Sequence, residues 1–133
     1  MLRPNRPERG KQLAERHRRR FERLVGAAMR KLPPEFARYL DDVAILVADE
    51  PSPEQRTSLG LTAEDVLFGL YEGTPETHRS SSFGMALPDR VTLFRRAFEE
   101  SCDSEAATIE EIRRTIIHEV AHHWGFEEDQ LKY

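Results

Sequence analysis

The sequence predicts a small domain of the α+β class. Apolar residues recur at helical spacing near both ends of the chain, and three short apolar runs typical of strands lie between them. The chain has 133 residues, of which 38% are hydrophobic and 33% charged, so it can bury one modest core beneath a strongly charged surface. We therefore expect a single domain over residues 12–133. Residues 1–11, which are basic and contain Pro4, Pro7 and Gly10, are expected to be a disordered lead-in.

The first element is predicted to be an amphipathic helix over residues 12–31. Its apolar positions lie on one face, and the three consecutive arginines Arg18, Arg19 and Arg20 lie on the other. Two prolines at positions 33 and 34 end this helix, because proline removes a backbone donor and clashes with the preceding turn. Further along, the sequence predicts a helical turn at 34–40, a buried strand at 43–48, another helical turn at 53–58 and a second strand at 66–71.

A polar, flexible segment at 78–84 precedes the last third of the chain. There the sequence predicts a turn at 88–90, a strand at 91–94 and a short helix at 94–101. The final element is a long helix that ends near Trp124. Thr108 and Glu111 have the spacing of a capping box, which predicts that the helix begins at Thr108.

Charge is divided unevenly along the chain. Residues 1–31 carry eleven Lys/Arg and three Asp/Glu, a net charge of +8, whereas residues 32–133 carry nine basic and twenty-one acidic residues, a net charge of −12. A basic arm on an acidic body can bind nucleic acid or anionic lipid. However, no aromatic or groove-reading motif accompanies the arginines. We interpret the arm as a solvated helix face that also lies against the acidic body, and we do not expect nucleic acid as a partner.

The composition also bears on the cellular compartment. No apolar run is long enough to cross a membrane, and the basic N-terminus lacks the apolar core of a secretory signal. The one cysteine, Cys102, excludes an internal disulfide. These features predict a cytoplasmic protein without a membrane partner.

The strongest functional signal is a pair of histidines in the last predicted helix. His118 and His122 are four residues apart, so their rings project from neighbouring points of one helix face and can reach one metal ion. Glu119 is rotated by about 100° from His118, which places it beside the ion without making it a ligand. It suits a general base that takes a proton from water. HExxH on a helix is the metalloprotease signature.

Gly125 makes the motif more specific. Two histidines and a glutamate on an exposed helix can be plain surface residues, and HExxH alone does not exclude that interpretation. A glycine three residues after His122 can adopt the left-handed conformation that ends a helix and turns the chain. The turned chain can then bring a later carboxylate back to the same ion.

The extended motif, His118-Glu-Val-Ala-His122-His-Trp-Gly125, resembles that of the zincin metallopeptidases whose third ligand is an aspartate. Upstream segments also resemble the small bacterial zincin-like metallopeptidases, or minimal zincins: 43–50, 70–73, Arg79, 87–89 and 91–94. The resemblance covers roughly residues 20–133, the length of one domain. It implies a small mixed sheet packed against the N-terminal helix and the HExxH helix, with the HExxH helix lying under an edge strand.

Carried over residue by residue, the resemblance makes His118 and His122 ligands of one zinc ion and Glu119 the base. The family pattern has aspartate at the position of Glu128, and Asp129 follows it. Glutamate has the same ligating group, so we favour Glu128 as third ligand, Asp129 as the alternative and His123 after both. Since histidine ligands must be deprotonated, the site can be empty in the isolated protein.

The sequence leaves the groups around the zinc open. All three methionines precede His118, so no methionine turn can follow the motif, and we expect the C-terminal Tyr133 to pack beside the metal instead. Tyr71, Arg79, His123 and Tyr133 are the candidate donors to a developing oxyanion. His123 and Arg79 are also explained as ordinary surface residues. The strand at 91–94, if it is an edge strand, would bind an extended peptide by adding it to the sheet.

These residues predict a zinc metallopeptidase that hydrolyses peptide bonds in a peptide or protein substrate. A chain this short has little material for a deep cleft, so its activity would be weak or would depend on a partner or a homodimer. The alternative is an inactive zincin-like module that binds a partner protein. The presence of Glu119 favours the enzyme, because a purely structural metal site does not need that carboxylate.

Overall fold

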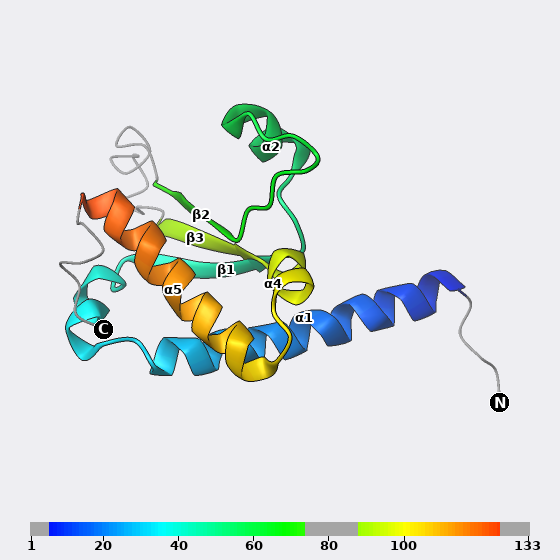
Figure 1. Ribbon diagram of the computed structural model, residues 1–133, viewed down its shortest axis with the longest axis horizontal. Coiled ribbons are helices and arrows are strands. Elements are labelled where there is room, and N and C mark those ends of the chain that lie inside the picture. The colour runs from blue at the N-terminus through cyan, green and yellow to red at the C-terminus, as the bar shows by residue number, and fades with distance from the viewer. Residues whose placement is uncertain (1–5, 74–87, 126–133) are drawn as a thin grey trace, which may run out of the picture.

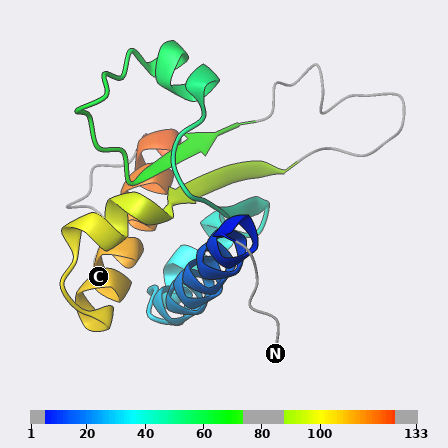
Figure 2. The ribbon, with the colours of Figure 1, turned by 90° about the vertical axis from the view of Figure 1, so that its right-hand side faces the viewer.

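The computed structural model describes residues 6–73 and 88–125, which form a three-stranded mixed sheet with two long helices on one face (Figures 1 and 2). This architecture confirms the predicted α+β class. The elements are α1 (Arg6–Arg30), the 3-10 helix η1 (Pro34–Tyr39), β1 (Val43–Ala48), α2 (Pro53–Leu59), β2 (Gly69–Glu72), β3 (Asp89–Phe94), α4 (Arg95–Ser101) and α5 (Glu105–Trp124).

The strand order is β1-β3-β2, so β3 is the central strand. β3 pairs in parallel with β1, from Val43 opposite Asp89, and antiparallel with β2, from Gly69 opposite Leu93. The prediction that the strand around 91–94 could be an edge strand that binds a peptide is therefore wrong. Its apolar sequence predicts burial but does not say which strands flank it. In the described sheet the edges are β1 and β2.

Three element boundaries differ from the predicted ones. β3 begins at Asp89, so residues predicted as a turn at 88–90 partly belong to the strand. β2 begins at Gly69 rather than Val66, whose side chain is 59% exposed. α5 begins one turn early because Ser104 caps it: the Ser104 hydroxyl accepts a hydrogen bond from the Ala107 N–H at 3.0 Å.

Helix α1 begins at Arg6. The prediction that residues 1–11 are disordered is therefore wrong for residues 6–11, which are helical. Proline is tolerated in a first helical turn because its missing N–H would have no partner there, which accommodates Pro7. Gly10 costs about 1 kcal/mol in a helix interior and does not by itself end a helix. In Figure 1 this N-terminal part of α1 projects beyond the other described elements.

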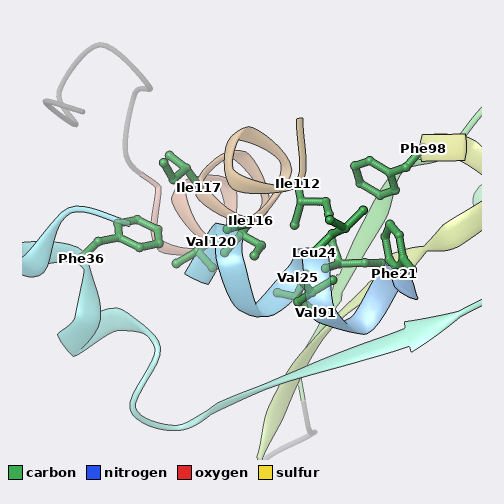
Figure 3. Packing of buried hydrophobic residues seen from close by; sticks show 12 residues of the cluster. Phe21, Leu24, Val25, Phe36, Val91, Phe98, Ile112, Ile116, Ile117 and Val120 are labelled. Atoms are coloured by element: carbon green, nitrogen blue, oxygen red, sulfur yellow. The ribbon is translucent and has the colours of Figure 1, made fainter. Parts of the chain in front are cut away.

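The core lies between α1, α5 and the inner face of the sheet (Figure 3). Its fully buried side chains come from three distant parts of the sequence, which explains why the domain needs both long helices. They include Phe21 and Ala28 of α1, Val91 and Leu93 of β3, Phe98 of α4, and Ile112, Ile116, Ile117 and Val120 of α5.

The basic face of α1 lies partly against acidic residues of the same chain, as the charge pattern predicted. Arg20 Nε lies 3.3 Å from Glu105 Oε2, and Arg23 contacts the same carboxylate at 3.5 Å. His17 Nδ1 lies 3.7 Å from Glu99. Glu105 is also in the first turn of α5, where a negative charge interacts favourably with the helix dipole. These contacts join α1 to α4 and α5.

Within residues 6–73 and 88–125, no helix has the length and apolar character needed to span a membrane.

Candidate metal centre

His118 and His122 lie one turn apart on the exposed side of α5. Their ring centroids are 4.2 Å apart and the ring planes are tilted by 42°. Helix geometry alone produces this arrangement, because residues four apart are neighbours on one helix face. Two adjacent imidazoles are a donor set that fits zinc, which binds histidine nitrogen readily.

Helix α5 packs against strand β2, and the residues in contact advance in step along the two elements. The Tyr71 N–H donates to Glu119, and one turn later along α5 a Cβ atom added at Gly73 would lie 3.7 Å from His123 Cε1. One turn earlier, Gly69 lies against Thr115. Four helical residues advance about 6 Å and two strand residues about 6.6 Å. Contacts can therefore repeat every four residues of α5 and every two residues of β2. The HExxH helix therefore lies under an edge strand.

Glu119 is half-buried between α5 and this edge strand. Its Oε2 accepts a hydrogen bond from the Tyr71 backbone N–H at 3.3 Å. Burial raises the pKa of the Glu119 carboxyl, while the Tyr71 hydrogen bond and the two neighbouring histidines oppose the rise. A partly desolvated carboxylate beside two imidazoles is an environment that suits a general base.

The close approach of β2 to α5 depends on Gly69. A Cβ atom at this position would lie 2.8 Å from Thr115 Cγ2 and 3.3 Å from the Thr92 carbonyl oxygen. With any larger residue at this position, either the strand or the Thr115 side chain would have to shift. Gly69 thereby sets the distance across which the Tyr71 N–H reaches Glu119.

We expect Gly69→Ala to lower the free energy of unfolding by about 1–2 kcal/mol. Overpacking costs about 1–3 kcal/mol, which exceeds the gain of about 0.4–1 kcal/mol from a less flexible unfolded chain. Urea denaturation of both proteins measures the difference. Adding Thr115→Ser, which removes the clashing methyl group, should recover most of the loss. A Gly69→Ala protein as stable as the parent would show that β2 is not held close by packing.

Tyr71 and His123 belong to a small cluster with Asp89. The Tyr71 hydroxyl donates to Asp89 Oδ2 at 2.7 Å, and its ring stacks on His123 with centroids 4.0 Å apart. His123 Nε2 lies 3.6 Å from the same Asp89 oxygen. Tyr71 therefore contacts Glu119 through its backbone N–H, while its hydroxyl, a candidate oxyanion donor in the sequence, is engaged by Asp89. Asp89 was not predicted as part of the site, because the residues at 88–90 have a pattern typical of a turn.

Gly125 ends α5 as predicted. Its φ is 74°, in the left-handed region, and its N–H donates to the carbonyls of Ala121 and His122. The favoured third ligand Glu128, its alternative Asp129, and the auxiliary candidates Arg79 and Tyr133 lie outside the described residues. Among the residues that are described, no group of three His, Cys, Asp or Glu side chains is placed to hold a metal ion.

A cleft of about 490 Å³ extends from His118 and Glu119 along α5. Its floor is formed by α5, from Glu111 to Glu119, and its wall by the segment 66–69 that leads into β2. His118 and Glu119 lie at one end of the cleft and Glu111 at the other. The candidate metal centre thus adjoins a space that can receive part of a substrate.

The family model described as zincin-like metallopeptidase matches residues 40–133. Among solved structures, the chain is similar to a conserved hypothetical protein from Thermus thermophilus, with 25% sequence identity and a TM-score of 0.51. That match covers 80% of this chain and 92% of the other. No curated protein matches the chain. The family match spans well over half of the sequence and includes both histidines and Glu119, and the chain therefore belongs to the zincin-like metallopeptidase family.

Proposed function

We propose that the protein is a zinc-dependent metallopeptidase in which Glu119 is the general base. The observation that carries the proposal is the position of Glu119, half-buried beside two facing imidazoles and hydrogen-bonded to the edge strand. A structural metal site needs ligands alone. A carboxylate next to the ligands, in a partly desolvated position, is what proton transfer requires.

His118 and His122 would hold the zinc ion, with Glu128 as the third ligand and Asp129 as its alternative. When bound, zinc would act as a Lewis acid that polarises the peptide carbonyl and makes a water molecule more acidic. Glu119 would accept the proton of the attacking water through its carboxylate. It would then pass that proton to the nitrogen of the departing amine, which completes hydrolysis.

The edge of β2 that faces away from β3 would hold the substrate backbone. The Phe94 N–H donates to the Phe68 carbonyl at 2.9 Å. In an antiparallel pair the direction of the backbone N–H and C=O groups alternates, so those of Leu70 and Glu72 point toward β3 and those of Gly69 and Tyr71 point away from it. The Tyr71 N–H already donates to Glu119, so an extended peptide would add to this edge through the backbone groups of Gly69, beside Glu119. β2 replaces the central strand β3 as the proposed peptide-binding strand.

Metal analysis combined with peptide cleavage tests this proposal. We expect about one zinc ion per chain after reconstitution at neutral pH, and zinc-dependent cleavage within a mixed peptide library. Removal of zinc by a chelator should stop cleavage, and zinc addition should restore it. His122→Ala should lose both zinc and activity, while His17→Ala, on α1, should retain both.

Two results would contradict the proposal. Zinc binding without turnover on the library would favour the alternative, an inactive zincin-like module that binds a partner protein. If the reconstituted chain does not bind zinc, His118 and His122 are not zinc ligands. The proposal of a zinc peptidase is then wrong as well.

A further inference from the structure

We propose that the cleft along α5 is a substrate subsite that selects a lysine or arginine side chain, with Glu111 as the residue that determines this specificity. The inference rests on the proposed peptidase function and adds to it a substrate class. The selected side chain belongs to a residue about three positions from the scissile bond.

The register between α5 and β2 fixes this distance. Thr115 lies beside Gly69 and Glu119 beside Tyr71, and the same step places Glu111 near Leu67, where both residues line the cleft. Glu111 is seven residues from His118, a distance of about 10 Å along a helix. An extended peptide covers that distance in about three residues.

Glu111 supplies the charge of the subsite. Its half-buried carboxylate makes no ion pair or hydrogen bond within residues 6–73 and 88–125. The other charged residue of this end of the cleft, Arg114, is already engaged, because its Nε lies 3.1 Å from Glu110 Oε1. A cationic side chain entering here would therefore meet Glu111 as an available partner.

Glu110, the partner of Arg114, carries its negative charge over a wide pH range. Hydrogen bonds from Arg113 and then Arg114 lower the pKa of the Glu110 carboxyl to about 2, against the opposing effect of burial. Glu110 is thus ionised at any pH at which the protein would be assayed. Arg114 thus has a charged partner other than Glu111 throughout this pH range.

The wall of the cleft fits the stem of a long basic side chain. Val66 lines the cleft with a side chain that is 59% exposed, and Leu67 and Phe68 follow it. Lysine and arginine bury their aliphatic stems on apolar surface while the charged end reaches a polar partner. The net charge of −12 carried by residues 32–133 also favours the approach of a cationic peptide.

A set of peptides tests the subsite. Each peptide carries a single lysine, and the set places this lysine at every position on both sides of the cleavage site. The zinc-loaded wild type should cleave the best lysine peptide about 5- to 10-fold faster, in kcat/KM, than its glutamate counterpart. Glu111→Gln should remove the preference and Glu111→Lys should invert it. Glu100→Lys, the same charge reversal at an exposed site of α4, should leave the preference unchanged.

Fluorescence anisotropy can measure peptide binding to the Glu119→Gln protein. This measurement separates the proposed subsite from the proposed peptidase activity. Cleavage without a Glu111-dependent preference would overturn the subsite and leave the peptidase standing. Glu111-dependent binding of lysine peptides without any wild-type cleavage would support the subsite and overturn the peptidase. Absence of both binding and cleavage would overturn both.

Discussion

Replacing Glu119 with glutamine is expected to reduce kcat/KM for peptide hydrolysis by about 10²–10⁴-fold, the contribution of a general base. Glutamine has the same shape and can still accept the Tyr71 hydrogen bond through its carbonyl oxygen, so β2 and α5 should stay in register. What glutamine cannot do is take the proton of the attacking water. Steady-state kinetics, zinc content and thermal unfolding of the two proteins measure these three properties separately.

The matched control is Glu99→Gln or Glu100→Gln on α4, which makes the same chemical change away from the histidine pair. Both controls should retain activity. If Glu119→Gln binds zinc, folds and cleaves peptides at the wild-type rate, Glu119 is not the base. If it loses zinc or unfolds, the residue contributes to structure, and the drop in rate says nothing about proton transfer.

Replacing Phe98 with alanine is expected to lower the free energy of unfolding by about 3–5 kcal/mol. Phe98 is fully buried, and its ring centroid lies 5.3 Å from that of Phe21 and 5.0 Å from that of Phe68. It therefore joins α1, α4 and the segment that forms the cleft wall. A loss of this size is a large part of the stability of a small domain, which is about 5–15 kcal/mol.

Urea denaturation at constant temperature measures this loss, with Phe98→Leu as the control. Leucine keeps most of the buried apolar surface and should cost roughly half as much, because the residual cavity is smaller. Leu59→Ala, at a side chain that is 44% exposed, should change stability by less than about 1 kcal/mol. A Phe98→Ala protein as stable as the Leu59→Ala protein would show that the aromatic cluster is not part of the stabilising core.

Much of the candidate site could be predicted because it depends on local helix geometry. The spacing of His118 and His122 brings their rings together on any α-helix, and the rotation of Glu119 away from them follows from the same 3.6-residue turn. Gly125 adopts the predicted left-handed conformation because only glycine does so without steric cost. None of these features depends on a contact with a distant residue.

Features that depend on competition between segments were predicted less well. Ser104 and Thr108 are both suitable N-caps one turn apart, and Ser104 is the one used, while the Thr108 hydroxyl donates to the Ser104 carbonyl inside the helix. Similarly, the apolar pattern of residues 91–94 predicts a buried strand. It does not distinguish a central strand from an edge strand that is covered by other elements. Such alternatives are decided by packing energies that local sequence does not contain.

Periodicity along single segments was therefore enough to predict the fold class, the HExxH helix and the pairing of its two histidines. Three features became visible only in the packed domain: β2 is the edge strand beside Glu119, Tyr71 contacts this carboxylate through its backbone, and a cleft continues to Glu111. These features arise where α5 meets a strand about fifty residues earlier in the chain, at a distance that Gly69 permits. The physical reason is that contacts between distant segments are set by the mutual fit of their side chains, which becomes visible only when the segments are packed together.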